Sequence, residues 1–121
     1  MTRINVGINP KELIDKHLLA EHREIKRIPN LIKKGKFSLE NQPKEFKLGS
    51  GHVKFFYDKL LFLKKRYELL YNECVNREFN VQYYGDSWNN IPIKFMNDYI
   101  PNNNDIKIIK ERILEKIGNN K

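Results

Sequence analysis

The chain has little cysteine and no long apolar run. Cys74 is the single cysteine among 121 residues, which excludes an intramolecular disulfide and argues against a thiolate metal site. No apolar stretch approaches the roughly 18 residues of a membrane span. The opening "MTRINVGINPKELIDK" also lacks the apolar centre of a signal peptide. These absences predict a cytoplasmic protein.

Acidic residues are in the minority. Fifteen aspartates and glutamates face 23 lysines and arginines, which gives a formal net charge of +8. A balance this basic indicates a polyanionic partner. Nucleic acid fits better than a membrane surface, because no predicted helix combines a basic face with bulky apolar anchors. A basic soluble protein with no such partner is the alternative. The length favours one domain, residues 1–121.

Strand signals are weak throughout, so we expect an all-α fold with about three main helices. The first begins at Asn9, a suitable N-cap that is followed by Pro10 and, three residues after the cap, by Glu12. It should continue until Pro29 disturbs it. The Lys-, Gly- and Pro-rich stretch that follows, "KKGKFSLENQPKEFKLGSG", is typical of a loop.

Two further helices are predicted downstream. The second spans about residues 53–77, where apolar side chains recur every three or four positions: Val53, Phe56, Leu60, Leu63, Tyr67, Leu70 and Cys74. An irregular, aromatic-rich segment follows. Its Trp88 and tyrosines could stack on bases, but we favour a role in covering one end of the core. The third helix should be capped by Asn104, with Ile106, Ile109, Ile113 and Ile117 on one side.

The first predicted helix has three faces on a helical wheel. The core side carries Ile14, Leu18 and Ile25, the basic side carries Lys16, Arg23 and Arg27, and Glu24 lies on the boundary with His17 and Leu13. A carboxylate beside two arginines is most often an ion pair on a solvated face. The functional alternative is that DNA phosphates occupy the arginines and leave the carboxylate facing a deoxyribose as a general acid or base.

Metal and cofactor sites are not predicted. His17 and Glu21 share a helical face at a spacing of four, but His17 and His22 do not, and two ligands are too few for a metal. The sequence also lacks a Walker phosphate loop and a serine-nucleophile elbow. We therefore expect no metal and no cofactor.

Several stretches, taken in order, resemble the phage-type pyrimidine-dimer DNA glycosylases with abasic-site lyase activity, the endonuclease V type. They are "MTRIN", "HLLAEHRE" with Arg27 after it, "GSGHVKFFYDKLLFLKKR", and "DYIP" followed by "ERILEKI". The resemblance covers most of the chain. It implies a compact all-α repair enzyme that excises cyclobutane pyrimidine dimers and then nicks the strand by β-elimination.

The resemblance also implies a partner and a setting. The partner would be double-stranded DNA with ultraviolet lesions or abasic sites, bound by a monomer on nucleoid or viral DNA. Two alternatives remain open. One is a noncatalytic basic DNA-binding module, and the other is a lyase for abasic sites or oxidised bases without dimer specificity.

The family's chemistry implies roles for particular residues. Its initiator methionine is removed and the α-amine of the next residue, here Thr2, is the nucleophile. An α-amine has a pKa of about 7.7–8.0 against about 10.4 for lysine, so a useful fraction is neutral near pH 7. Glu24 matches the catalytic glutamate. The positions that match or are assigned to DNA contacts are Arg3, His17, His22, Arg23, Arg27, Arg112 and Lys116. The opening stretch and Glu24 should therefore meet in the fold.

Overall fold

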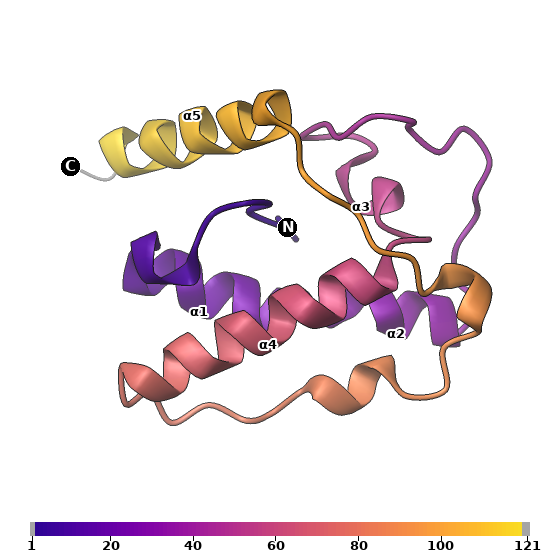
Figure 1. Ribbon diagram of the computed structural model, residues 1–121, viewed down its shortest axis with the longest axis horizontal. Coiled ribbons are helices and arrows are strands. Elements are labelled where there is room, and N and C mark those ends of the chain that lie inside the picture. Colours follow the sequence, from indigo (N-terminus) through magenta and orange to yellow (C-terminus); the bar gives the residue numbers. More distant parts are fainter. Residues whose placement is uncertain (1, 120–121) are drawn as a thin grey trace.

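Helices make up the regular structure of the computed structural model, which describes residues 2–119 (Figure 1). In chain order they are η1 (Pro10–Glu12), α1 (Asp15–Glu24), α2 (Arg27–Lys33), α3 (His52–Phe55), α4 (Leu60–Asn76), η2 (Gly85–Trp88), η3 (Ile93–Phe95) and α5 (Asn103–Asn119), where η marks a 3₁₀ helix. Over the described part of the chain, strand pairing is limited to an isolated bridge between Lys59 and Met96. The predicted all-α class is confirmed.

The first predicted helix starts later than expected. Asn9 does act as an N-cap, accepting the amide of Lys11 at 3.0 Å, but only for the short η1. Leu13 and Ile14 then adopt extended backbone conformations, so α1 begins at Asp15. Because of this break, the residues before Asp15 do not follow the predicted helical wheel. Leu13 is buried, whereas Ile14, which was predicted to face the core, is 42% exposed.

The helix break that Pro29 causes lies earlier in the chain than predicted, before the proline itself. A proline ring clashes with the carbonyl four residues before it, here that of Ile25, and so the helix breaks at residues 25–26. Pro29 itself lies in the first turn of α2, where its missing amide hydrogen costs nothing. The break leaves Glu24 as the last residue of α1 and Arg27 as the first of α2.

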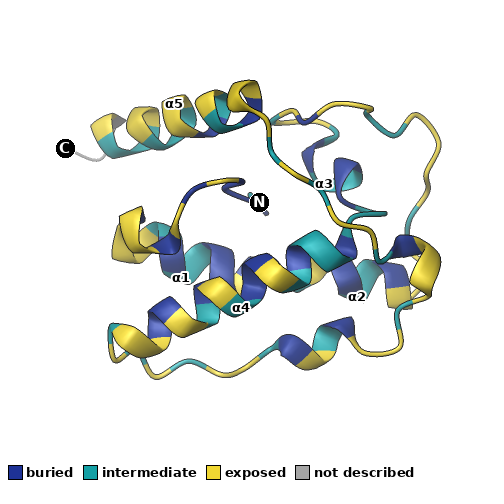
Figure 2. Cartoon of the chain, viewed as in Figure 1, coloured by how far each residue is buried: buried dark blue, intermediate teal, exposed yellow. Residues whose placement is uncertain are grey.

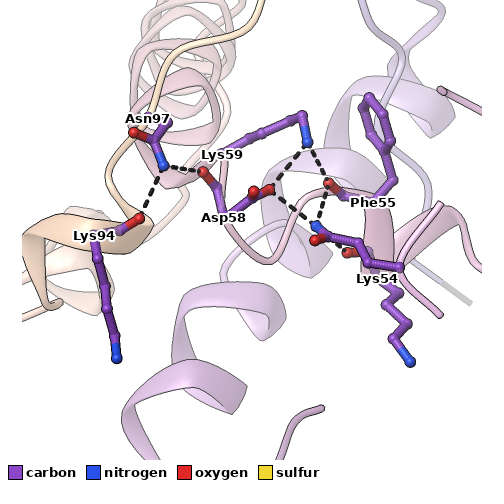
Figure 3. Close-up of polar contacts among 7 residues, drawn as sticks. Lys54, Phe55, Asp58, Lys59, Lys94 and Asn97 are labelled. Carbon is purple, nitrogen blue, oxygen red and sulfur yellow. Dashed lines mark hydrogen bonds and ion pairs between the residues drawn. The ribbon is translucent and has the colours of Figure 1, made fainter. Parts of the chain in front are cut away.

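The second predicted helix is also divided, into α3 and α4. At the end of α3, side-chain donors bind a backbone carbonyl that could otherwise accept the next hydrogen bond of a continuing helix. Gln42 Nε2 and Lys59 Nζ donate to the Phe55 carbonyl at 3.3 and 3.0 Å. Both also donate to the Asp58 carboxylate, at 2.9 and 3.0 Å. Asn97 then ties this break to η3 by donating to the Asp58 carbonyl at 2.8 Å (Figure 3). The division therefore has a specific polar cause.

The core lies against the apolar face of α4. The predicted spacing is confirmed there, because Leu60, Leu63, Tyr67, Leu70 and Cys74 are all fully buried. The aromatic-rich segment covers one end of this core, as we favoured. Trp88 is 5% exposed and its ring centroid lies 5.1 Å from that of Tyr67.

Helix α5 is capped by a different residue from the one predicted. The Asn102 side chain, not that of Asn104, accepts the amide of Asp105 at 2.8 Å. In return the Asp105 carboxylate accepts the amide of Asn102 at 3.2 Å, which makes a reciprocal capping pair. The inward face of α5 carries Ile109, which is fully buried, while its outer face is exposed (Figure 2).

The N-terminal segment passes between α5 on one side and α1 and α4 on the other (Figure 1). Ile4, Val6 and Ile8 alternate along it and are buried. Gly7 allows the crossing, since its φ is +71° and a Cβ there would lie 2.5 Å from Cγ1 of Ile106. No helix in residues 2–119 combines the length and apolarity needed to span a bilayer.

Candidate active site

A buried ion pair holds the N-terminal segment against the helices. Glu21 of α1 and Arg66 of α4 pair through two contacts of 2.7 and 3.0 Å, with side chains 1% and 5% exposed. Glu21 also accepts the amide of Asn5 at 3.3 Å and its side-chain Nδ2 at 2.7 Å. Arg66 donates to the carbonyl of Ile8. The two charges thus satisfy both each other and the irregular backbone of this segment.

Our sequence reasoning missed this network. The available signal was a charged residue inside an apolar face, since Arg66 lies three residues after Leu63 and four before Leu70. A buried arginine needs a buried acceptor. Glu21, on the face opposite the exposed flank of α1, was the partner to expect.

Glu24 lies beneath two exposed arginines. Its side chain is 11% exposed, whereas those of Arg23 and Arg27 are 61% and 55% exposed. The contacts are long, 3.5 Å to Arg23 and 3.3 Å to Arg27. Because both guanidinium groups are exposed and their contacts with Glu24 are long, they can turn toward phosphates. The predicted boundary position of Glu24 is thus reproduced, with the carboxylate on the protein side of the arginines.

The opening stretch reaches both α1 and α5. Thr2 is 9% exposed, and the next residue, Arg3, is half-buried. Burial lowers the pKa of Arg3, and the charge of Arg112 lowers it further, while Glu115 and Glu24 oppose the shift. Arg3 therefore lies within electrostatic range of Glu24 at the end of α1 and of Arg112 on α5. Met1, whose removal the resemblance implies, lies outside the described residues.

His17 belongs to the same cationic surface. Burial lowers its pKa, and the charges of Arg3, Lys16 and Lys116 lower it further. The N-terminal segment, α1, α2 and α5 thus contribute cationic side chains to one region, and His17 lies among them: Arg3, Arg23, Arg27, Arg112 and Lys116. Because neighbouring cations disfavour each other's charged forms, this region would gain most from a polyanionic ligand.

A pocket of about 860 Å³ opens beside the chain terminus. Thr2, Arg3 and Arg112 line one part of it, and the rest is lined by residues of the loop that begins at Asn41, by His52–Lys54 of α3 and by Tyr57. Its lining mixes cationic side chains, Arg3, Lys47, Lys54 and Arg112, with apolar ones such as Leu48 and Val53, and the cations suit an anionic ligand. Within residues 2–119, no three His, Cys, Asp or Glu side chains gather in a way that could hold a metal ion.

His22 does not belong to this surface. Its ring is 2% exposed and lies among tyrosines, with Nε2 3.1 Å from the hydroxyl of Tyr67. Burial is the largest cause of its lowered pKa, followed by the charge of Lys26. The predicted DNA contact by His22 is therefore contradicted, because α1 directs this side chain into the aromatic cluster and away from solvent.

The three histidines should make the free energy of unfolding depend on pH. The pKa of His17, His22 and His52 is lowered in the folded protein, chiefly by burial. Between the folded pKa and the ordinary value of about 6.5, the unfolded chain binds more protons, so the free energy of unfolding should fall as pH falls through this window. Urea unfolding at pH 7.5 and 5.5 measures the effect. A higher unfolding midpoint at pH 5.5 would contradict it.

Taken together, the fold and site define a small helical protein with a buried carboxylate beside a cationic surface, an arrangement that suits a polyanionic ligand. A family model described as pyrimidine dimer DNA glycosylase matches residues 1–84. The match covers more than half of the chain, and the chain belongs to the pyrimidine dimer DNA glycosylase family. This confirms the resemblance and supports DNA as the partner. Arg112 and Lys116 lie beyond the matched residues.

Proposed function

We propose that this protein excises cyclobutane pyrimidine dimers from duplex DNA and then nicks the strand at the resulting abasic site. The observation that carries the proposal is the position of Glu24. Its carboxylate lies under the exposed Arg23 and Arg27 and within electrostatic range of Arg3, which directly follows Thr2. A nucleophile, a carboxylate and phosphate-binding cations would then meet at one sugar.

In the first step, the neutral α-amine of Thr2 attacks C1′ of the damaged nucleotide. The nitrogen lone pair forms the N–C1′ bond, while the electron pair of the glycosidic bond leaves with the pyrimidine, which takes up a proton. Glu24 stabilises the positive charge that develops on the oxocarbenium-like sugar. Opening of the sugar ring then gives a protonated imine.

In the second step, the imine makes the C2′ hydrogen acidic. Glu24, directly or through a water molecule, assists removal of this proton, and the electron pair forms the C2′=C3′ double bond as the 3′ phosphate leaves. Hydrolysis of the imine returns the free amine. The same carboxylate thus serves both bond-breaking steps in its ionised form.

The cationic region would hold the duplex in register. Phosphate contacts orient a protein on DNA without reading its sequence, a role that suits Arg3, Arg23, Arg27, Arg112 and Lys116. His17, half-buried beside Arg3, would place the sugar. We propose a monomer acting on duplex DNA in the cytoplasm, with affinity that falls steeply as salt rises.

Borohydride trapping tests the proposal. The reagent reduces an imine to a stable amine, so the protein should become covalently attached to duplexes with a cyclobutane dimer or an abasic site, and not to undamaged DNA. Attachment to the abasic duplex alone would contradict dimer excision and identify a lyase that lacks dimer specificity. Salt-sensitive binding without attachment would identify a noncatalytic module.

Blocking the terminal amine should abolish activity. One uncleaved residue placed before Thr2 turns the nucleophile into an amide, and we expect nicking of abasic duplex to fall at least about 100-fold. Thr2→Ala, which keeps the amine and loses the hydroxyl, is the matched control and should stay within about threefold of wild type. Nicking rates are compared after intact-mass analysis of each N-terminus. Equal activity in the extended protein would exclude the amine as nucleophile.

A further inference from the structure

His52 joins the N-terminal segment to the loop that lines the pocket. It is the first residue of α3, and it is 4% exposed. Its Nε2 lies 2.9 Å from the amide nitrogen of Ile4, and its Nδ1 lies 2.8 Å from the carbonyl oxygen of Lys47. Ile4 is only two residues from Thr2, so a shift of its backbone is transmitted almost directly to the terminal amine.

Only one form of the ring satisfies both contacts. A backbone amide can only donate and a carbonyl can only accept, so Nε2 must accept from Ile4 while Nδ1–H donates to Lys47. This is the neutral imidazole in a single tautomer. A protonated ring would place a second N–H against the amide of Ile4 and break that contact. The position of the N-terminal segment is therefore tied to the protonation of His52.

The surroundings of His52 favour this neutral form. Burial between the rings of Phe46 and Phe56 is the largest cause of its lowered pKa. The hydrogen bond to Lys47 opposes the shift, the charge of Arg3 adds to it, and that of Glu21 opposes it. Of the helices facing this part of the segment, α1 contributes Glu21 and α4 contributes Arg66, and these two charges are paired with each other. Helix α5 contributes Arg112, which lines the same pocket as His52 and Arg3.

We propose that His52 is a positioning residue that sets the place of the Thr2 amine beside Glu24 and couples it to the pocket loop. The inference rests on the proposed function. Lys47 and its neighbours Ser50 and Lys54 line the same pocket as Thr2 and Arg3. DNA bound along this loop and the amine that attacks the sugar would then be held in register by one imidazole ring.

Two substitutions of His52 each remove one of the ring's two hydrogen bonds and keep the other. In His52→Gln the side-chain oxygen can occupy the place of Nε2 and accept from Ile4, while the contact with Lys47 is lost. In His52→Asn the side-chain nitrogen can occupy the place of Nδ1 and donate to Lys47, while Ile4 loses its acceptor. Each variant lacks one hydrogen bond, so they are matched in what they remove.

The test is the single-turnover rate of borohydride trapping on saturating abasic duplex. Since a misplacement of about 1 Å can cost about 100-fold, we expect His52→Asn to fall about 10- to 100-fold and His52→Gln to stay within about threefold, with equal affinity for the duplex. Below the pKa of His52, the wild-type rate should fall with one more proton than the His52→Gln rate, because the amine and His17 titrate in both proteins and the His52 ring only in the wild type.

Three results would overturn the role of His52. Equal trapping rates in the two variants would exclude positioning through Ile4. In the wild-type protein, an NMR chemical shift of the Ile4 amide that does not change as His52 titrates would also exclude positioning through Ile4, without any variant. A wild-type protein that is never trapped would instead overturn the imine chemistry itself, and the role of His52 with it.

Discussion

Glu24→Gln should lower strand cleavage of dimer-containing and abasic duplexes at least about 100-fold, because glutamine cannot stabilise a cationic sugar by charge or accept the C2′ proton. Affinity for the duplex should be unchanged or slightly higher, since Arg23 and Arg27 lose an anionic neighbour and keep their full charge for phosphate. Gel assays of nicking and fluorescence anisotropy of binding measure the two effects separately.

The control for this substitution is Glu12→Gln, which makes the same chemical change at an exposed residue of η1. It should leave cleavage and binding within about twofold of wild type, since Glu12 lines a separate hollow with Ile8 and Lys110 and does not line the pocket beside Thr2 and Arg3. Cleavage by Glu24→Gln at the control's rate would remove this carboxylate from the mechanism.

Arg66→Met should lower the free energy of unfolding by about 3–5 kcal/mol, because it leaves the buried Glu21 carboxylate without its cation. The Ile8 carbonyl loses its donor as well. For a domain with roughly 5–15 kcal/mol of stability, this is a large fraction of the total. Urea unfolding followed by circular dichroism measures the loss.

Lys65→Met provides the comparison on the same helix. Lys65 pairs with Asp98 at 2.7 Å, but both side chains are exposed, so its loss should cost less than about 1 kcal/mol. Glu21→Gln with Arg66→Met should cost less than the two single changes added together, because they share one network. Similar losses in Arg66→Met and Lys65→Met would contradict the structural role of the buried pair.

Local patterns predicted the elements of the fold better than their breaks. The spacing of Leu60 to Cys74 identified the buried face of α4 because apolar periodicity reports burial directly. The divisions at residues 25–26 and 56–59 depend on a clash with a carbonyl and on the side chains of Gln42 and Lys59. Gln42 is distant in sequence, so local pattern could not reveal its contact.

Local patterns likewise predicted some residues of the candidate site and missed others. The helical wheel placed Glu24 correctly relative to Leu18 and Arg23 because all three lie on one unbroken helix, α1. Leu13, Ile14 and Arg27 were also placed on this wheel but lie outside α1. His22 was misplaced since a histidine near arginines offers no sign of the tyrosines that enclose it. His52 was missed because its partner Ile4 belongs to an N-terminal segment without regular structure, whose path is set by tertiary contacts. Arg66 was missed because its partner Glu21 lies on another helix, distant in sequence.

Glu21, Arg66 and His52 hold the N-terminal segment through hydrogen bonds to its backbone. Its amides at Ile4 and Asn5 and its carbonyl at Ile8 are all bonded to buried side chains. Chain ends are commonly mobile unless they are tied down in this way. A nucleophile at the terminus would need such order, because its rate depends on a near-attack geometry with the sugar.

The most direct test of the central claim is to locate the bond that borohydride traps. The covalent complex on abasic duplex is digested with a nuclease and a protease, and the modified peptide is sequenced by mass spectrometry. We predict that the sugar remnant is attached to the α-nitrogen of Thr2 in a chain that lacks Met1. A remnant on a lysine side chain, or on a chain that retains Met1, would contradict the mechanism.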